Sequence, residues 1–247
     1  MVEPKYITSK DNPRIKEMKK LQSKKYRRKL DQFLIEGAHL VEEAMTHGQK
    51  IHALVFLDGY DHAKYDDQEI ETFIVNDNVM KTLSSLETPP GIMAVVSYAA
   101  PETDGRRVLL LDGIQDPGNL GTLLRTADAF GFGRVILSLD TVDAFSDKVL
   151  RSAQGSTFHI DIKSMDAAEA VQDFDGTVLA TDPEGAVPLE EAPAGDPLMV
   201  ILGNEGRGVS DTVLAQVDRK IKIEMPGASE SLNVAIAGGI IMHHFKA

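Results

Sequence analysis

The chain has 247 residues, is 43% hydrophobic and contains no cysteine. This length suits one or two domains with a buried core, and the lack of cysteine excludes disulfides, thiolate zinc sites and cysteine nucleophiles. The longest apolar run, 234–242, is far shorter than the roughly 20 residues that span a bilayer. The first ten residues lack the apolar core of a signal peptide, so we expect a cytoplasmic protein without a membrane segment.

Charge is distributed unevenly along the chain. The net charge is −12, yet residues 1–30 hold eleven Lys and Arg against three acidic residues, which makes this segment +8 and the remainder −20. A basic arm on an acidic body indicates a nucleic-acid contact. The alternative is a solvated helix that serves solubility only.

The basic arm carries one helix signal. Asn12 followed by Pro13 is typical of a helix N-cap and first turn. Apolar residues then recur at intervals of three, at Ile15, Met18 and Leu21. Because this stripe is thin and the next strand begins only at residue 33, we expect residues 1–30 to be dispensable for folding.

Residues 31–98 have the pattern of a small α/β domain. Strands are predicted at 33–36, 51–57, 71–75 and 92–98, and helices at 37–47 and 77–86. Alternation of strands and helices over so few residues favours one small domain. Residues 99–107 contain Pro101 and Gly105 and are predicted to be a linker.

Residues 108–247 are predicted to form a larger α/β domain. Val108–Leu111 is a continuous apolar run, typical of a strand buried on both faces of a parallel sheet. Further strands are predicted at 135–137, 178–180, 199–202 and 221–223, and helices at 146–153, 166–173, 209–217 and 231–245. This alternation predicts a mostly parallel sheet with helices on both faces.

The first loop of interest, Asp116-Pro-Gly-Asn119, leads into a predicted helix. That helix has one apolar face, formed by Leu120, Leu123, Leu124 and Ala127. An α-helix turns about 100° per residue, which places Arg125 off this face. We therefore expect Arg125 to face a cleft. The alternative is that Asn119 caps the helix and Arg125 is a solvated surface cation.

Two more loops follow predicted strands. Residues 203–208 have three glycines in the order G-x-x-G-x-G, which differs from the dinucleotide-binding order and also fits a plain turn. Residues 223–234 lead into the last helix, for which Ser231 is an N-cap candidate. Val234–Met242 is apolar all round, so this helix is predicted to be buried, and Gly238 and Gly239 suggest close approach by another backbone.

Taken in order, these three loops resemble the three motifs of the SpoU/TrmH family of the SPOUT class. The stretches are LDGIQDPGNLGTLLRTADAFG, VILGNEGRGVS and IKIEMPGASESLNVAIAGGI. Residues 30–98 are similar to the ribosomal-protein-like substrate-binding domain of the family. The resemblance implies a C-terminal trefoil knot, a homodimer with the last helix near its interface, and S-adenosylmethionine as methyl donor.

The resemblance also implies roles for individual residues. Asn119 and Arg125 fall on the catalytic pair of the first motif, and Glu205 on the acid of the second. Polar positions of the third motif fall on Ser231 and Asn233. The positions that hold the cofactor fall on Gly203, Ile223 and Leu232. Two departures affect the cofactor loop: Glu224 stands where relatives often have Pro, and Ala235 where Ser is frequent.

The activity implied is transfer of a methyl group to a ribose 2′-OH of RNA. Ribosomal RNA is favoured because the first domain resembles those of rRNA-directed relatives. We expect no metal, since the seven His are scattered and the adjacent His243 and His244 point about 100° apart on a helix. Alternatives are a non-catalytic RNA-binding ribosome assembly factor, a tRNA 2′-O-methyltransferase and an enzyme acting on a small nucleotide.

Overall fold

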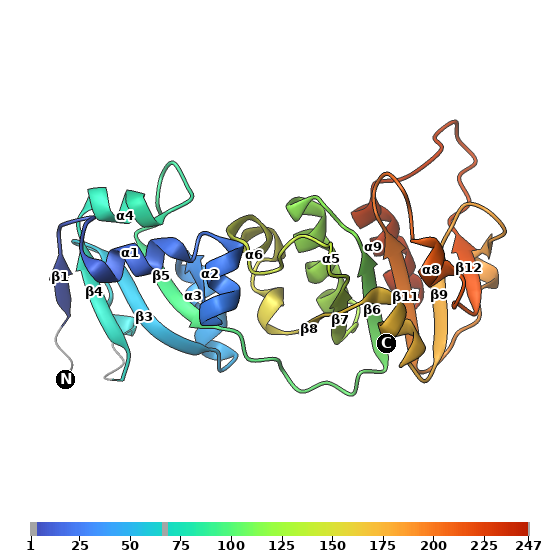
Figure 1. Cartoon of the computed structure of the whole chain (residues 1–247), viewed down its shortest axis with the longest axis horizontal. Helices are drawn as coiled ribbons and strands as arrows, with labels where there is room; N and C mark the ends of the chain where they lie inside the picture. Colours follow the sequence, from blue (N-terminus) through green and yellow to red (C-terminus); the bar gives the residue numbers. More distant parts are fainter. Residues whose placement is uncertain (1–3, 66–68, 247) are drawn as a thin grey trace. The chain divides into compact units, whose positions relative to one another are not determined.

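A computed structural model describes residues 4–65 and 69–246 (Figure 1). Residues 1–3 of the predicted basic arm lie outside these ranges. The chain divides into two compact units. The N-terminal unit comprises the described residues up to Ala99 together with Phe145–Phe158, and the C-terminal unit comprises Ala100–Ala144 and the residues from His159 on.

A mixed five-stranded sheet forms the N-terminal unit. In sheet order its strands are β1 (Lys5–Ile7), β4 (Glu71–Val75), β3 (Lys50–Leu57), β5 (Ile92–Ser97) and β2 (Phe33–Glu36). β1 and β3 run parallel to β4, whereas β5 is antiparallel to both β3 and β2. All four strands predicted here are present. β1 was not predicted, because three residues are too few to show an alternating pattern.

The described residues of this unit form five short α-helices. They are α1 (Pro13–Lys20), α2 (Lys24–Leu30), α3 (Ala38–Thr46), α4 (Asp77–Leu83) and α6 (Asp147–Ala153). Single 3₁₀ turns lie at Ala63–Tyr65 and Ser156–Phe158. The predicted start of α1 is confirmed, since the Asn12 side chain accepts from the Arg14 N–H and Pro13 is the first helical residue.

The burial of residues within 1–30 argues against the expectation that this segment is dispensable for folding. Ile15, Met18 and Leu21 are at most 3% exposed and lie in one core cluster with Ile7 of β1 and with residues of β3, β4 and β5. A narrow stripe is enough to bury α1 when every member of the stripe is fully covered. The arm is therefore part of the N-terminal unit, and only its polar face is available for other contacts.

Residues 145–158, which the sequence analysis assigned to the C-terminal domain, pack in the N-terminal unit. The Phe145 ring lies 4.9 Å from the Phe33 ring of β2, centroid to centroid. Leu150 and Phe158 are fully buried in the same core cluster as Phe33. Nothing in the apolar pattern of this segment indicates which of two cores receives it.

The C-terminal unit is built on a seven-stranded sheet in which every strand pair is parallel. In sheet order the strands are β10 (Val187–Pro188), β12 (Arg219–Lys222), β9 (Thr177–Thr181), β11 (Leu198–Gly203), β6 (Arg107–Asp112), β7 (Arg134–Leu137) and β8 (Asp161–Ser164). The predicted parallel sheet is confirmed. β8 and the two-residue β10 were not predicted, because both are short and lack an apolar run.

Four α-helices belong to the C-terminal unit: α5 (Pro117–Ala129), α7 (Ala167–Gln172), α8 (Asp211–Leu214) and α9 (Val234–His244). A 3₁₀ turn lies at Leu189–Glu191. α5 buries the four apolar residues predicted for its inner face. α8 is shorter than the predicted helix at 209–217, because it begins only after its N-cap Ser210 and passes into a turn at residues 215–216.

α9 differs from the prediction at its start. Its N-cap is Asn233, whose side chain accepts from the N–H groups of residues 235 and 236, so Ser231 is not the cap. The single chain buries only part of α9, since Ile236 is 56% and Ile240 40% exposed, and burial of the remaining face by a second copy stays a prediction. The other face packs on α5 and β11, where a Cβ on Gly238 would lie 2.5 Å from Leu123 Cδ2. Within the described ranges, no helix has the length and apolar character needed to cross a membrane.

Candidate functional site

The three loops singled out by the sequence meet at one edge of the parallel sheet. β6 and β11 are neighbours in register, with Leu111 opposite Leu202 and Asp112 opposite Gly203. Their carboxyl ends therefore release the loops before α5 and before α8 side by side. This edge is where open α/β sheets bind ligands.

A chain of side-chain hydrogen bonds joins these loops. The Asn119 amide donates to Glu205 Oε1 at 3.1 Å, and Asn119 Oδ1 accepts from Asn233 Nδ2 at 3.0 Å. Asn119 does not cap α5, because Asp116 is the N-cap and accepts from the Asn119 N–H. The side-chain amide of Asn119 is therefore free of capping and connects Glu205 to Asn233. Three of the five predicted catalytic residues are thus brought together.

Glu205 lies in an environment that favours its charged form. Burial raises the pKa of its carboxyl, but the hydrogen bond from Asn119 and those from backbone N–H groups, including Gln115 and Asp116, outweigh burial and lower the pKa below its ordinary value. The two backbone donors lie 3.3 and 3.4 Å from the carboxylate oxygens. The site therefore holds a carboxylate that stays charged at neutral pH.

Arg125 and Ser231 are not joined to this chain. Arg125 is on α5, away from its buried face, and its side chain is exposed. Among the described residues it has no hydrogen-bond or ion-pair partner, so its guanidinium can turn toward a bound molecule. Ser231 is exposed in the loop before α9, where its carbonyl accepts from Ser229 Oγ at 2.8 Å.

The predicted cofactor residues lie at the same edge of the sheet. Gly203 ends β11 and is buried, and a Cβ at this position would collide with the backbone of Gly208 and Val209, so only glycine fits there. Ile223 follows β12 and is half-buried. Leu232 is 38% exposed in the loop before α9, and Met225 is similarly exposed at 37%. Leu232 and Met225 are therefore available to contact the apolar face of a ligand.

Sequence reasoning missed several residues that shape this edge. Asn204 donates from Nδ2 to the Gly113 carbonyl at 2.7 Å, and Ser138, which is buried, accepts from the Gly113 N–H at 2.8 Å. Arg207 forms an ion pair with Asp140. Arg207 stands inside the second motif, but Asp140 follows β7, outside all three motifs, and no local pattern marks it.

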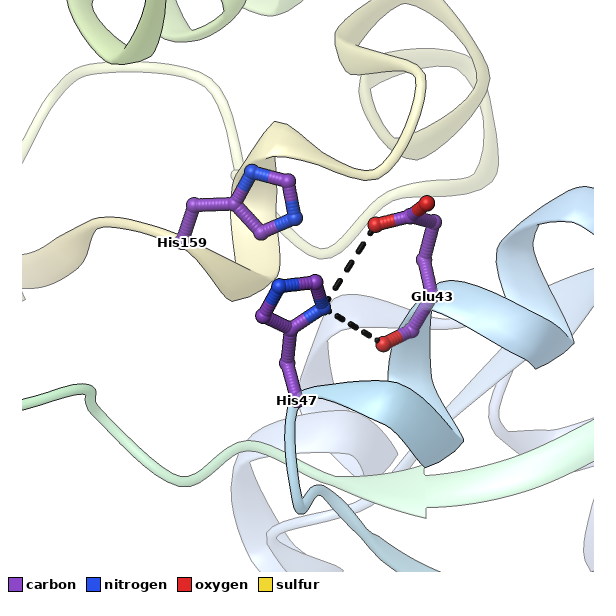
Figure 2. Close-up of side chains that lie close together, drawn as sticks. All are labelled: Glu43, His47 and His159. Carbon is purple, nitrogen blue, oxygen red and sulfur yellow. Dashed lines mark hydrogen bonds and ion pairs between the residues drawn. The ribbon is translucent and has the colours of Figure 1, made fainter.

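The prediction that the protein uses no metal stays a prediction. Glu43 lies in α3 and His47 is the C-cap residue that follows it, and His47 Nδ1 is 3.0 Å from the Glu43 carbonyl oxygen and 3.5 Å from Glu43 Oε2 (Figure 2). Two side chains are fewer than the three or four ligands of a typical zinc site. His159 belongs to the C-terminal unit, where its Nδ1 lies 2.8 Å from Asp128 Oδ2.

Two protein families match the chain, over different residue ranges. The SpoU rRNA Methylase family matches residues 106–243, and the MRM3-like substrate binding domain matches residues 12–94. The first match spans the parallel sheet and all three loops. The second spans most of the N-terminal unit, including α1 and α2.

Individual relatives match over nearly the whole chain. The 23S rRNA (guanosine(2553)-2′-O)-methyltransferase RlmP of Bacillus subtilis (strain 168) is 37% identical over 246 residues, 98% of this chain and 99% of that protein. The 23S rRNA (uridine(2479)-2′-O)-methyltransferase of Streptomyces viridochromogenes is 27% identical, over 88% of this chain and 83% of that protein. The crystal structure of an AdoMet-bound rRNA methyltransferase from Sinorhizobium meliloti has a TM-score of 0.88 at 30% identity, covering 98% of this chain and 97% of that one. The chain therefore belongs to the SpoU rRNA methylase family.

Proposed function

We propose that the protein transfers a methyl group from S-adenosylmethionine to a ribose 2′-OH of ribosomal RNA. The observation that carries this proposal is the hydrogen-bond chain from Glu205 through Asn119 to Asn233, which joins all three motif loops at the ligand-binding edge of the sheet. Two relatives named as 23S rRNA 2′-O-methyltransferases support ribosomal RNA over transfer RNA.

Arg125 is the residue that we assign to the reacting hydroxyl. S-adenosylmethionine, when bound, supplies a methyl group on a sulfonium, so the enzyme must position the 2′-OH and stabilise the charge it develops. A guanidinium is a poor base because its pKa exceeds about 12. Arg125 therefore acts by stabilising the alkoxide that develops as the 2′-OH passes its proton to a phosphate oxygen of the substrate RNA, and its exposed, unpaired side chain supports that role.

Asn119, Glu205, Asn233 and Ser231 hold the site around Arg125. The carboxylate of Glu205 fixes the Asn119 amide, and Asn119 in turn fixes Asn233 at the start of α9. The loop between β12 and α9 is thereby tied to α5. Ser231, exposed in that loop, is placed to contact substrate or cofactor.

The residues at the edge of the sheet fit S-adenosylmethionine. Gly203 lets the backbone of Gly208 and Val209 pack closely against the end of β11, which gives the loop beside the proposed cofactor site its compact shape. Leu232 and Met225 are exposed apolar side chains that an adenine ring would cover, and the half-buried Ile223 precedes Met225 by two residues. Backbone polar groups together with apolar side chains suit a nucleoside with a short charged tail.

The N-terminal unit is the proposed RNA-binding part. Among the described residues, the following cations of the basic arm have no hydrogen-bond or ion-pair partner: Lys10, Lys19, Lys20, Lys24, Lys25, Arg28 and Lys29. By contrast, Lys5, Arg14 and Lys16 pair with carboxylates. These unpaired cations on α1 and α2 are available to RNA phosphates. The net negative charge of the rest of the chain would repel the phosphates.

We further propose that the chain is a homodimer and that residues after β12 pass through a loop to form the trefoil knot of the family. Ile236 and Ile240 are four residues apart on α9, so they lie on one helix face, and both are exposed in the single chain. A second copy would cover them. The knot is supported by the position of α9, which packs back on α5 and β11 after the long loop at 223–233.

Tritiated methyl transfer tests the RNA class. Total RNA from a strain lacking the protein is separated into ribosomal and transfer fractions, and each is incubated with the purified protein and labelled S-adenosylmethionine. Label in ribosomal RNA is the expected result. Label confined to transfer RNA, or binding of the cofactor without transfer to either fraction, contradicts the proposal.

A further inference from the structure

An exposed ion pair borders the motif loops and has no part in the proposed chemistry. Arg207, in the loop after β11, pairs with Asp140, in the loop after β7. Their side chains are 59% and 51% exposed. Exposed ion pairs of this kind contribute only about 0–1 kcal/mol to the free energy of unfolding. The stability of the whole unit therefore does not explain why Arg207 and Asp140 are paired.

Asp140 is fixed to the loop that follows β6. Its Oδ1 accepts from Ser138 Oγ at 2.7 Å, and Ser138 Oγ accepts from the Gly113 N–H. The Asp140 carbonyl accepts from Gln115 Nε2 at 2.8 Å, and the same amide donates to the Gly113 carbonyl at 3.0 Å. Asp140 is therefore a fixed carboxylate, held by its side chain and its backbone.

Arg207 lies in a loop that is closed on itself. Asn204 and Gly208 exchange two backbone hydrogen bonds, of 3.0 and 2.9 Å, across the turn. Asn204 Oδ1 accepts from the Arg207 N–H at 3.1 Å while its Nδ2 donates to the Gly113 carbonyl. Glu205 lies between Asn204 and Arg207 in this loop. A displacement of Arg207 would therefore also displace Glu205, which accepts from the Asn119 amide.

Gly113 shows how closely the pair crosses the sheet edge. It has φ +77°, and a Cβ there would lie 2.7 Å from Arg207 Nη2 and 3.2 Å from Asp140 Oδ2. The ion pair thus lies directly over the backbone of the first motif, at the residue that follows β6. The hydrogen bond from Ser138 lowers the pKa of Asp140, burial raises it, and Arg207 lowers it further, with a net lowering that keeps the carboxyl charged at neutral pH.

We propose that Asp140 and Arg207 are positioning residues that hold the 203–208 loop so that Glu205 meets the Asn119 amide. This inference rests on the proposed roles of Glu205 and Asn119. Neither residue needs to touch RNA or cofactor. Their effect on the reaction passes through the geometry of the hydrogen bond between Asn119 and Glu205.

The test compares Asp140→Asn, Arg207→Gln and the reversed pair Asp140→Arg with Arg207→Asp. Each single change should lower kcat about tenfold, a barrier increase of about 1.4 kcal/mol, with little change in Tm or in the Kd for S-adenosylmethionine. The reversed pair should recover most of the loss, because the attraction is restored. The matched control is Arg106→Gln, which breaks a similarly exposed pair with Asp196 in the same unit and should leave kcat unchanged.

A second readout does not depend on turnover. The side-chain amide resonances of Asn119, assigned by their loss in Asn119→Asp, report its hydrogen bond to Glu205. They should shift in Asp140→Asn toward their positions in Glu205→Gln. This readout stands even if ribosomal RNA proves not to be the substrate, which separates failure of the inference from failure of the proposed function.

Three outcomes would overturn the inference. In one, Asp140→Asn leaves both kcat and the Asn119 amide signals unchanged while Glu205→Gln lowers kcat. In another, Glu205→Gln itself has normal kcat, so that positioning Glu205 has no consequence. In the last, Arg207→Gln raises KM for RNA, Asp140→Asn has no effect and the reversed pair fails to recover, which would make Arg207 an RNA contact.

Discussion

The basic face of α2 gives the most quantitative prediction for RNA binding. α2 has no buried residue, and four of its cations, Lys24, Lys25, Arg28 and Lys29, have no ion-pair partner among the described residues. Replacing all four with Gln removes four positive charges without touching the core. The last turn loses its favourable interaction with the helix dipole, worth about 0.3–1 kcal/mol per residue at most, so the unit should stay folded.

The expected size of the effect follows from counterion release. Each phosphate contact on single-stranded RNA contributes about −0.7 to the slope of log K against log salt, so four contacts contribute about −3. Between about 50 and 200 mM salt, these contacts alone would weaken wild-type binding about 50-fold. The quadruple variant should lose this part of the slope and raise KM for RNA, while its Kd for S-adenosylmethionine stays unchanged.

Binding of a ribosomal RNA fragment, measured by fluorescence anisotropy across a salt series, checks this prediction. A matched control replaces four exposed cations that already pair with carboxylates: Lys64, Lys81, Arg106 and Lys163. The control changes net charge equally but should keep most of the slope. If the folded α2 variant keeps the wild-type slope, or both variants lose it equally, the arm does not contact phosphates and the reasoning is refuted.

The remaining predictions concern the catalytic unit. Arg125→Ala should lower kcat by about 10²–10³-fold, the usual loss for one donor to a developing oxyanion, with the cofactor Kd nearly intact, and near-normal turnover in a folded variant would remove Arg125 from the mechanism. Because the pKa of Glu205 is lowered in the folded state, its charge stabilises the fold above its unfolded pKa of about 4.3, and this stabilisation is lost as pH falls through the folded pKa. The Tm difference between wild type and Glu205→Gln should therefore be constant above about pH 4.3 and shrink below it, and a difference that shrinks already near neutral pH would contradict the lowered pKa. Ile236→Glu with Ile240→Glu should convert a dimer of about twice the 26.9 kDa chain mass into a monomer in sedimentation, and an unchanged mass would place the interface elsewhere.

The elements that the sequence predicts well are those whose pattern has a single physical solution. The run at 108–111 can only be a strand covered on both faces, and the four apolar residues of α5 define one helix face. The strands preceding the motif loops are of this kind. Their carboxyl ends put the loops of Asn119 and Glu205 at the same edge of the sheet, and the pairing of β6 with β11 then brings the two side chains together.

The misplaced features depend on contacts distant in sequence. Residues 145–158 are apolar enough for either core, and it is the packing of Phe145, Leu150 and Phe158 in the cluster around Phe33 that assigns them to the N-terminal unit. Composition predicts that α9 is buried, but it does not indicate which of its faces the chain itself covers, and Ile236 lies on the face that the single chain leaves exposed. Asp140 has no local signal, because its significance comes from a partner in another loop.

The most direct test of the account is the identity of the methylated atom. Ribosomal RNA from a strain lacking the protein is incubated with wild type, with Arg125→Ala and with S-adenosylmethionine, digested to nucleosides and analysed by mass spectrometry. The account predicts one 2′-O-methylated nucleoside produced by wild type and absent with Arg125→Ala. A methyl group on a base, or an equal yield of ribose methylation from both proteins, would contradict it.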